Sequence, residues 1–300
     1  MIAGAIVGFG RVLGLLPMSV GVGVGRLLGW LAHAVLVRPR RFAREHVAIA
    51  FPERDAAACG RLVRETFVHA GASFAELALF EKIVRDSDYV RLDGATVLEA
   101  ALAQGRGVIA ATGHCGNWEL LAAWGAAIGW PITVVVRRVT DLRFHALIVR
   151  FRTAAGVEVL VRDDPNFVRA VGDALRRNRI VAMLIDQDTR GAGVFVPFFG
   201  RLARTPPGAA VLALRGKVPL VTAFIERRAD GGHLIRVTPV PLDVPRGRFG
   251  VEQLTGRLTA AIEAQIRRVP AEWVWWHERW RTPPERHARL VAVGGVERSG

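Results

Sequence analysis

The stretch GVIAATGHCGNWELLAAWGAAIG, residues 107–129, decides the fold because it contains a complete strand, turn and helix. Residues 107–112 form a short apolar run that begins at a glycine, which is typical of a buried strand. Residues 117–129 have the apolar composition of a buried helix, ended by Gly129 and the proline two positions later. The turn between them holds His114. The sequence therefore predicts a histidine at the carboxyl end of a buried strand.

The same alternation continues on both sides of this unit. Further strands are expected at 132–137, 157–161, 180–186, 219–228 and 233–240, the last two as a hairpin. Further helices are expected at 54–83 with Asp55 as a cap, 141–156, 165–178, 205–217 with Thr205 as the N-cap, and 249–270. Alternating strands and helices predict an α/β fold: a mixed, largely parallel central sheet flanked by helices.

Composition limits the kind of partner. The 300 residues carry a formal net charge of +14, almost all of it from arginine, since only Lys82 and Lys217 are lysines. A positive surface attracts phosphate-bearing partners such as anionic lipid, nucleic acid or an acidic protein. The same composition also fits arginines spread evenly over a solvated surface. Cys59 and Cys115 provide neither a disulfide framework nor metal-ligand spacing, so we expect a reducing compartment, no metal and no cofactor.

The N-terminus is the most apolar part of a chain whose mean hydropathy is +0.26. Residues 1–37 are almost wholly apolar or glycine, and four arginines follow within 38–44. Basic residues after the apolar run do not fit a signal peptide but favour the cytoplasmic side of a membrane. Pro17 and the glycines at 21, 23 and 25 argue against one regular span. We expect a membrane-embedded or interfacial anchor of two short helices; a helix pair buried in the core is the alternative.

The chain shows no internal repeat and no linker long enough to divide it. The expected domains are a membrane anchor at 1–37, a catalytic domain at 38–285 and a loose tail at 286–300.

His114 and Glu119 are candidates for catalysis because ligands of open α/β sheets bind at the carboxyl ends of the strands. Asn117 is expected to cap the helix, which places Glu119 in the first turn, where the helix dipole favours a carboxylate. A glycine turn would let His114 fold back and donate a hydrogen bond to Glu119, leaving its other nitrogen as a general base. A capped helix with a buried histidine is the alternative.

No nucleophile of the protein is expected at this site. The chain has no GxSxG elbow, and Cys115 adjoins His114, where neighbouring side chains seldom face each other. The sequence therefore predicts that His114 deprotonates a hydroxyl of the substrate, which attacks an activated acyl group directly.

The motif HCGNWE, residues 114–119, has the His-x4-acid form of glycerolipid acyltransferases and resembles the bacterial late acyltransferases of lipid A biosynthesis (lauroyl/myristoyl type). Residues 186–214 and 270–284 resemble two further blocks of that family. Residues 38–53 resemble a segment near its N-terminus, although His46 stands where asparagine is more usual. The resemblance covers roughly residues 5–284, and three ordered motifs make it specific.

The resemblance implies an enzyme on the cytoplasmic face of the cell inner membrane. It implies transfer of a fatty acyl chain from acyl carrier protein, a thioester donor, to a hydroxyl of a phosphorylated glucosamine lipid, with His114 and Glu119 as the catalytic pair. Relatives that acylate mannosylated phosphoinositides usually carry aspartate as the acid, so Glu119 favours the lipid A type. An anionic glycolipid or phospholipid acceptor and an acidic carrier both suit the +14 charge.

Five residues are candidates for substrate binding: Asn117, Arg137, Asp186, Gln187 and Arg190. Arg137 and the next arginine end the strand after His114 and could bind phosphate. Asp186 and Gln187 end another strand, where they could hold the acceptor sugar or brace the histidine loop. Arg190 lies between glycines and could meet a phosphate or the pantetheine arm. Exposed loop arginines and an ordinary strand-end cap are the alternatives.

Two aromatic segments have open interpretations. Residues 194–199, VFVPFF, could line an acyl slot, dip into the bilayer or belong to the core. Residues 273–280, WVWWHERW, place three tryptophans at helical spacing, which fits a membrane interface or a packed core stripe.

Two other functions remain as alternatives: a thioesterase or lipid hydrolase that uses the same base on water, and a basic membrane-surface or nucleic-acid-binding protein. The basic residues are scattered among apolar blocks rather than gathered in an aromatic-flanked stripe, so no nucleic acid is expected.

Overall fold

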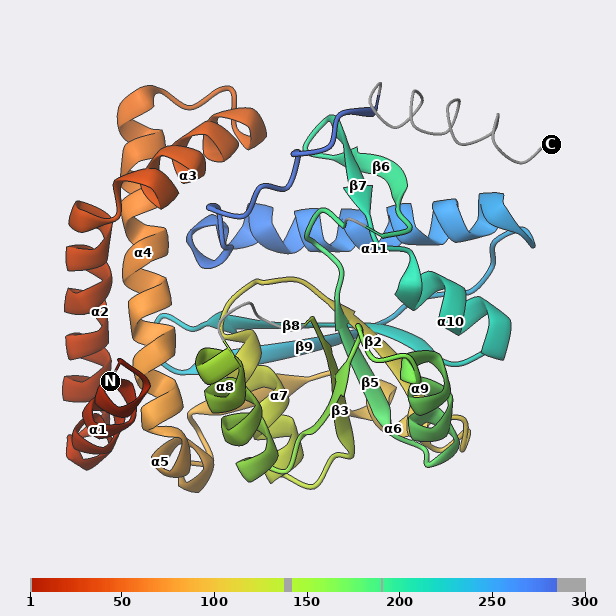
Figure 1. Cartoon of the computed structure of the whole chain (residues 1–300), viewed down its shortest axis with the longest axis horizontal. Helices are drawn as coiled ribbons and strands as arrows, with labels where there is room; N and C mark the ends of the chain where they lie inside the picture. The colour runs from red at the N-terminus through yellow and green to blue at the C-terminus, as the bar shows by residue number, and fades with distance from the viewer. Residues whose placement is uncertain (1, 138–141, 190, 285–300) are drawn as a thin grey trace.

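The structure is a computed structural model that describes residues 2–137, 142–189 and 191–284. Its centre is a seven-stranded sheet in the order β1-β9-β8-β2-β5-β3-β4 (Figure 1). The strands are β1 (Val90–Asp93), β2 (Val108–Thr112), β3 (Ile132–Val136), β4 (Glu158–Val161), β5 (Ile180–Leu184), β8 (Leu220–Arg227) and β9 (His233–Pro239). Every neighbouring pair is parallel except the hairpin of β8 and β9. The predicted α/β fold with a mixed, largely parallel sheet is confirmed.

Strand β2 lies inside the sheet between β5 and β8, and all five of its residues are buried. Its register with β5 pairs Val108 with Ile180 and Thr112 with Leu184. Because the two strands are parallel, the residues that follow them leave the sheet at the same edge. This register brings the loop after Thr112 beside the residues after Leu184.

Helices cover both faces of the sheet (Figure 1). One core cluster joins the sheet to α6 (Ala95–Leu102) and α7 (Trp118–Ala127). The other joins it to α9 (Phe167–Arg176), α10 (Gly208–Gly216) and α11 (Arg248–Arg268). Helix α8 (Leu142–Ala154) contacts β4 and α7. Apolar side chains buried on both faces explain why the central strands read as continuous hydrophobic runs.

The N-terminal third is helical: α1 (Ile2–Leu15), α2 (Met18–Val35), α3 (Val37–Ala50), α4 (Ala56–Ala78) and α5 (Phe80–Arg85). Helix α4 begins at the predicted cap, where the Asp55 carboxylate accepts a 2.6 Å hydrogen bond from the backbone N–H of Ala58. Helices α2 and α4 lie along each other at the edge of the molecule (Figure 1).

The glycines of α2 do not interrupt the helix; they allow its backbone to approach α4. A Cβ atom on Gly25 would lie 2.5 Å from the carbonyl oxygen of Gly71, and one on Gly29 would lie 2.1 Å from that of Phe67. Both distances are shorter than any real carbon–oxygen contact, so these positions accept only glycine. The break that Pro17 predicts is present between α1 and α2.

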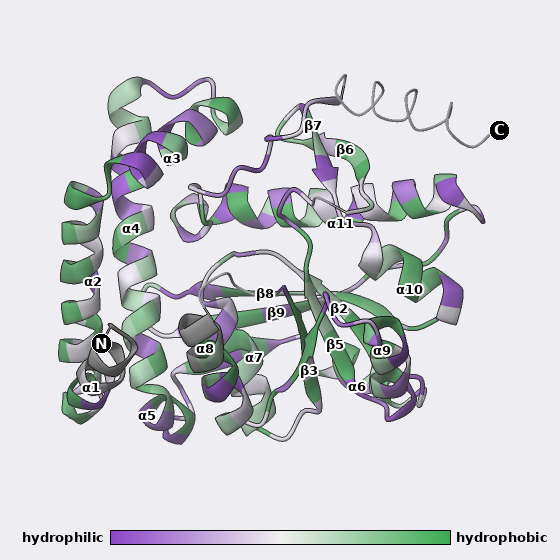
Figure 2. Cartoon of the chain, in the orientation of Figure 1, coloured by the Kyte–Doolittle hydropathy of each residue, from purple (hydrophilic) through white to green (hydrophobic). Residues whose placement is uncertain are grey.

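Helix α2 is largely apolar along its length (Figure 2), and several of its large apolar side chains are exposed. Its exposed large side chains are Val20, Leu27, Leu28, Trp30, Leu31 and Val35. Within the described part of the chain, α2 is the one helix that is long and apolar enough to cross a membrane, judged by length and composition. A helix pair wholly buried in the core does not describe this arrangement, and the membrane contact itself stays a prediction.

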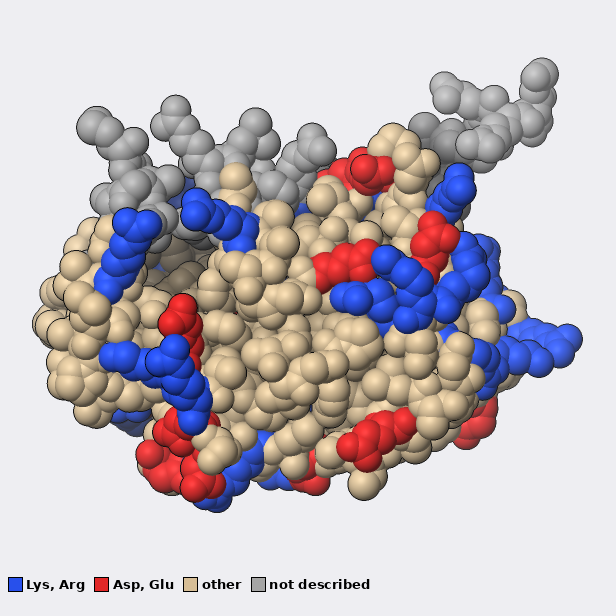
Figure 3. All heavy atoms as spheres, turned by 90° about the horizontal axis from the view of Figure 1, so that it is seen from below, with Lys and Arg blue, Asp and Glu red and all other residues tan. Residues whose placement is uncertain are grey.

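Charge is distributed in small groups on the face that Figure 3 shows, where blue basic side chains stand beside red acidic ones. This face therefore presents no single broad basic surface, in keeping with the scattered arginines of the sequence.

Three sequence-based expectations are wrong. Thr205 does not cap α10; it is the last residue of β7 (Arg201–Thr205), which forms a hairpin with β6 (Val194–Phe198). Residues 273–280 are not helical, because the chain leaves a short 3-10 turn, Pro270–Glu272, and continues as extended and turn segments. The single helix expected at 54–83 is divided into α4 and α5. The strands β1, β6 and β7 and the helices α3 and α6 were not predicted. The expected tail at 286–300 lies outside the described residues.

Candidate active site

The loop after β2 is built around Gly116, which has φ +62. A Cβ atom there would lie 1.9 Å from the carbonyl oxygen of Ile225, so only glycine fits. The Gly116 N–H donates a 2.8 Å hydrogen bond to the Glu272 carbonyl, and Cys115 forms an isolated antiparallel bridge with Trp273. The segment at 272–273 thus fixes the backbone that carries His114.

The imidazole of His114 is held by Asp186 rather than by Glu119. Its Nδ1 lies 2.7 Å from Oδ1 of Asp186, and the backbone N–H of His114 donates a 2.7 Å hydrogen bond to Oδ2. The indole N–H of Trp273 donates a third, 2.8 Å hydrogen bond to the same Oδ2. The expected hydrogen bond from His114 to Glu119 is therefore wrong, because both ring nitrogens face other partners.

The protonation state of this pair follows from the contacts of Asp186, which is 1% exposed. Burial would raise the pKa of the carboxyl, but the charge and hydrogen bonds of His114, together with the Trp273 indole, outweigh burial and hold the pKa below its usual range. An ionised carboxylate only accepts hydrogen bonds, so Nδ1 of His114 carries the proton. In the neutral imidazole, Nε2 then keeps its lone pair, toward which the amide nitrogen of Gln187, 3.3 Å away, can donate. His114 is thereby oriented as a base.

Glu119 is committed to another contact. Arg152 of α8 binds both of its oxygens, with Nε 2.8 Å from Oε2 and Nη2 2.6 Å from Oε1. The indole N–H of Trp118 donates to Oε1 at 3.2 Å. The Trp118 ring stands edge-on to His114, with 5.0 Å between ring centroids. Glu119 therefore contacts Trp118, which in turn contacts His114, and so holds the Trp118 ring in place beside the imidazole.

An apolar pocket of about 160 Å³ opens next to this wall. It lies between α4, the start of α7 and the segment after the 3-10 turn. Its apolar lining includes Phe74, Leu77, Trp118, Val274 and Trp276. Its polar lining includes His69, Asn117, Glu119, Glu272 and His277. Apolar walls with a few polar groups are typical of a small-molecule or acyl-chain site.

His277 borders both this pocket and the base. Its ring stands at 90° to that of His114, with centroids 4.8 Å apart, and the Gln187 amide nitrogen is 3.0 Å from its Nδ1. Burial, followed by the nearby His114, lowers the pKa of His277 to about 3, so it is neutral at physiological pH. Among the described residues, a carboxylate contacts His114 but none lies within hydrogen-bond distance of His277, so His114 is the better candidate for a base.

The predicted substrate-binding residues differ in position and in the contacts that they make. Asn117 lines the pocket, but it caps α7 at the N–H of Leu120 and donates to Glu76 and the Ser73 carbonyl, so its polar atoms are used internally. Asp186 holds the histidine loop in place through its hydrogen bonds with His114, which is one of the two roles expected for it. Gln187 faces the site.

Arg137 is exposed at the end of β3 and lines a second, polar hollow beside Gln187. Arg190 and Arg138 lie outside the described residues.

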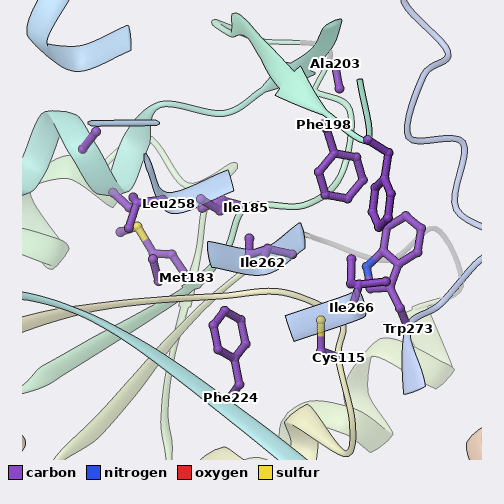
Figure 4. Packing of buried hydrophobic residues seen from close by; sticks show 14 of the residues in the cluster. Cys115, Met183, Ile185, Phe198, Ala203, Phe224, Leu258, Ile262, Ile266 and Trp273 are labelled. Carbon is purple, nitrogen blue, oxygen red and sulfur yellow. The ribbon is translucent and has the colours of Figure 1, made fainter. Parts of the chain in front are cut away.

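The cysteine and the aromatic segments belong to the core. Figure 4 shows Cys115 beneath Trp273 and Ile266, with Phe198 on the other side of the indole. Burial raises the pKa of the Cys115 thiol, which leaves it protonated and unsuited to attack. Phe198 is 0% exposed, so VFVPFF neither lines the described pocket nor reaches a bilayer through that side chain. The core interpretation of both aromatic segments is confirmed for Phe198 and Trp273.

One functional contact was missed from the sequence and another was left open. Support of the histidine loop was one of two roles expected for Asp186, but the hydrogen bond with the His114 imidazole was expected from Glu119, although His114 and Asp186 both follow strands that turn out to be neighbours. The pairing of Arg152 with Glu119 had no local signal, because the two residues are 33 positions apart and meet only through the packing of α8 on α7.

Comparison with known proteins identifies the family of the chain. The family model described as "Bacterial lipid A biosynthesis acyltransferase" matches residues 1–282. A phosphatidylinositol mannoside acyltransferase of Mycolicibacterium smegmatis is 32% identical over 198 residues, covering 64% of this chain and 64% of the relative. Its counterpart in Mycobacterium tuberculosis is 31% identical over 204 residues, covering 66% and 62%. The chain thus spans somewhat less than two thirds of the length of these relatives.

A lipid A biosynthesis palmitoleoyltransferase of Escherichia coli is 26% identical over 276 residues, covering 90% of this chain and 87% of the relative. The lipid A type of relative is therefore matched over more of the chain, and the mannoside type at higher identity.

Proposed function

The chain belongs to the bacterial lipid A biosynthesis acyltransferase family, and from that premise we propose that it transfers a fatty acyl chain from an acyl-carrier-protein thioester to a hydroxyl of an anionic glycolipid. The observation that carries the proposal is the 2.7 Å contact between Nδ1 of His114 and the buried Asp186 carboxylate. This contact leaves Nε2 as a base beside an apolar pocket, as transfer to a hydroxyl requires.

In the proposed reaction, Nε2 of His114 removes the proton of the acceptor hydroxyl. The hydroxyl oxygen attacks the thioester carbonyl, the carbon–sulfur bond breaks, and the carrier thiolate takes the proton back from the imidazolium. Asp186 stabilises the imidazolium while it exists, as a buried carboxylate does in a catalytic triad. A thiolate leaves readily, so the reaction needs no covalent enzyme intermediate, in agreement with a buried and protonated Cys115.

The apolar pocket is proposed to hold the part of the acyl chain next to the thioester. Trp118 and Trp276 would then flank the chain on the side of His114, since both line the pocket. Glu119, named from the sequence as a partner of the base, is proposed to act as a positioning residue. Its ion pair with Arg152 has side chains only 17% and 13% exposed and holds Trp118 in place.

The acceptor is proposed to be a lipid A precursor or a related glycolipid. A phosphoinositol-mannoside-like acceptor is the second candidate, favoured by the higher identity of the mycobacterial relatives. We place residues 1–37 at the cytoplasmic face of the inner membrane, because α2 exposes an apolar face and the arginines of 38–44 follow it.

The test is product analysis with the purified protein in mixed micelles. In two separate incubations, the protein would receive acyl carrier protein that bears a radiolabelled acyl chain, together with either a lipid A precursor or a phosphatidylinositol mannoside. The proposal predicts label in the glycolipid and a requirement for acceptor. Label released as free fatty acid, with no acylated lipid in either incubation, would identify a hydrolase instead.

A further inference from the structure

A second hollow, of about 360 Å³, shares Trp276 and His277 with the apolar pocket and is also lined by Gln187. Four segments that are far apart in the sequence contribute to its wall. They are the start of α3 (Arg38, Pro39, Phe42), the end of β3 (Arg137), the residues after β5 (Gln187, Asp188) and the C-terminal segment (Trp276, His277, Glu278, Arg281). We call this hollow the arginine pocket.

The charges of the arginine pocket do not cancel. Arg281 lies 3.5 Å from Asp188, whose side chain is 2% exposed and also accepts from Thr282, so these two charges compensate each other. Glu278 is exposed. Arg38 and Arg137 are exposed and form no ion pair with any residue that the structure describes; Arg38 only lies 5.8 Å from the centroid of the Phe42 ring. Two free guanidinium groups therefore face one hollow, the arrangement that binds phosphate.

The side chain of Gln187 contacts His114 and also lines the arginine pocket. The Gln187 amide nitrogen lies 3.3 Å from Nε2 of His114 and 3.0 Å from Nδ1 of His277, and both Gln187 and His277 line the arginine pocket. A ligand with its phosphate between Arg38 and Arg137 would thus present neighbouring groups to His114.

The position of Arg38 shows from which side such a ligand comes. Helix α2, with its exposed apolar face, ends at Val35, and Arg38 follows within the first turn of α3. A lipid whose tails lie in a bilayer beside α2 would have its phosphate at this level. The phosphate of acylated carrier protein, by contrast, is separated from the thioester by the long pantetheine arm and is not required to lie next to the base.

We propose that Arg38 and Arg137 form a binding site for a phosphate group of the acceptor glycolipid, which orients one of its hydroxyls toward His114. The site rests on the proposed function and deepens it: it makes phosphate on the acceptor a determinant of specificity, and it assigns the donor phosphate to another place.

The test compares Arg38→Gln/Arg137→Gln with the unchanged protein on two acceptors, a phosphorylated glucosamine lipid and the same lipid after enzymatic removal of its phosphate. Loss of charge-assisted hydrogen bonds predicts a KM for the phosphorylated lipid raised by about tenfold or more, with kcat nearly unchanged. The KM for acylated carrier protein and the activity on the phosphate-free lipid should not change.

The matched control is Arg61→Gln/Arg64→Gln, which removes two exposed charges from the neighbouring helix α4, outside the arginine pocket. The proposal expects this control to behave as the unchanged protein. If both double variants raised the KM for the phosphorylated lipid equally, Arg38 would contribute only general attraction to anionic lipid, and the proposed phosphate site would be refuted.

A raised KM for the carrier alone would assign the pocket to the donor and equally overturn it. Absence of transfer by the unchanged protein would count against the proposed function rather than against the site.

Discussion

The substitution Asp186→Asn tests how the base is oriented. Asp186 accepts three hydrogen bonds, from Nδ1 of His114, from the backbone N–H of His114 and from the Trp273 indole. An asparagine has one oxygen for these donors, and its NH₂ group must face at least one of them. If the NH₂ group donates to Nδ1, the imidazole proton moves to Nε2, and the nitrogen that faces the substrate is no longer a base.

The expected loss follows from this change of tautomer and from the missing negative charge beside the imidazolium. Removal of the corresponding charge in catalytic triads lowers kcat by about 10⁴-fold, so we expect a loss of about 10³- to 10⁴-fold here, or about 4–5 kcal/mol of transition-state stabilisation. The KM values should change little, because Asp186 is 1% exposed and offers no surface to substrate.

The assay is initial-rate transfer from acylated carrier protein to glycolipid between pH 5 and 9, with circular dichroism to verify the fold. Trp273→Phe is the control, because it removes one hydrogen bond from Asp186 but leaves the contact with His114. We expect this control to retain most of the activity. A kcat of Asp186→Asn within tenfold of the unchanged protein would refute the assignment of Asp186 as the partner of the base.

Three further predictions concern the surroundings of the site. Single substitutions Glu119→Gln and Arg152→Gln should each lower kcat by about tenfold, and the double variant should lose little more, because the two residues act as one ion pair; additive losses in this cycle would contradict that. Gly29→Ala should lower the free energy of unfolding in detergent by about 2 kcal/mol or more, since its Cβ would lie 2.1 Å from a carbonyl oxygen of α4. The control Gly23→Ala places its Cβ in open space, with no neighbouring atom within 4 Å, and should be neutral or stabilising by up to about 1 kcal/mol. Burial raises the pKa of Glu272 from 4.5 to about 7, so its contribution to stability is complete below pH 4.5 and is lost as pH rises through 7. In thermal unfolding, the stability of Glu272→Gln relative to the unchanged protein should therefore increase by up to about 3 kcal/mol between pH 4.5 and 8. A difference in stability that stays constant over this range would contradict the raised pKa.

The sequence specified the unit around β2 well, for reasons that are local. An apolar run of five residues, a glycine turn and an asparagine cap are all read within one segment, and the Asn117 cap on Leu120 is confirmed. The alternation of strands and helices then limited the fold to an α/β sheet. The glycines of α2 were read as interruptions because their role depends on Gly71 of α4, which is distant in sequence.

The partner of the base could not be read from spacing. Glu119 is five residues from His114, but the first turn of α7 directs it toward Arg152 of α8. Asp186 is 72 residues away and reaches His114 only because β2 and β5 are parallel neighbours in a fixed register. The order of parallel strands in a sheet has no local signature, which is why the roles of these two acids were not separated from the sequence.

The helical spacing of the tryptophans in the C-terminal segment does not match its backbone, for a similar reason. Trp273, Trp276 and Trp280 have helical spacing, yet the segment is fixed by the bridge of Trp273 to Cys115 and by the indole hydrogen bond to Asp186. These contacts require an extended backbone at Trp273. Buried tertiary contacts thus override the local periodicity at this segment.

The most direct test of the account is the rate of acyl transfer to glycolipid by His114→Gln, measured with acylated carrier protein and a lipid A precursor or phosphatidylinositol mannoside. Glutamine preserves a polar side chain of similar reach but has no basic nitrogen. The account predicts a kcat at least about 10³-fold below that of the unchanged protein, with the fold preserved. Transfer at an undiminished rate by His114→Gln would contradict the central role of the histidine.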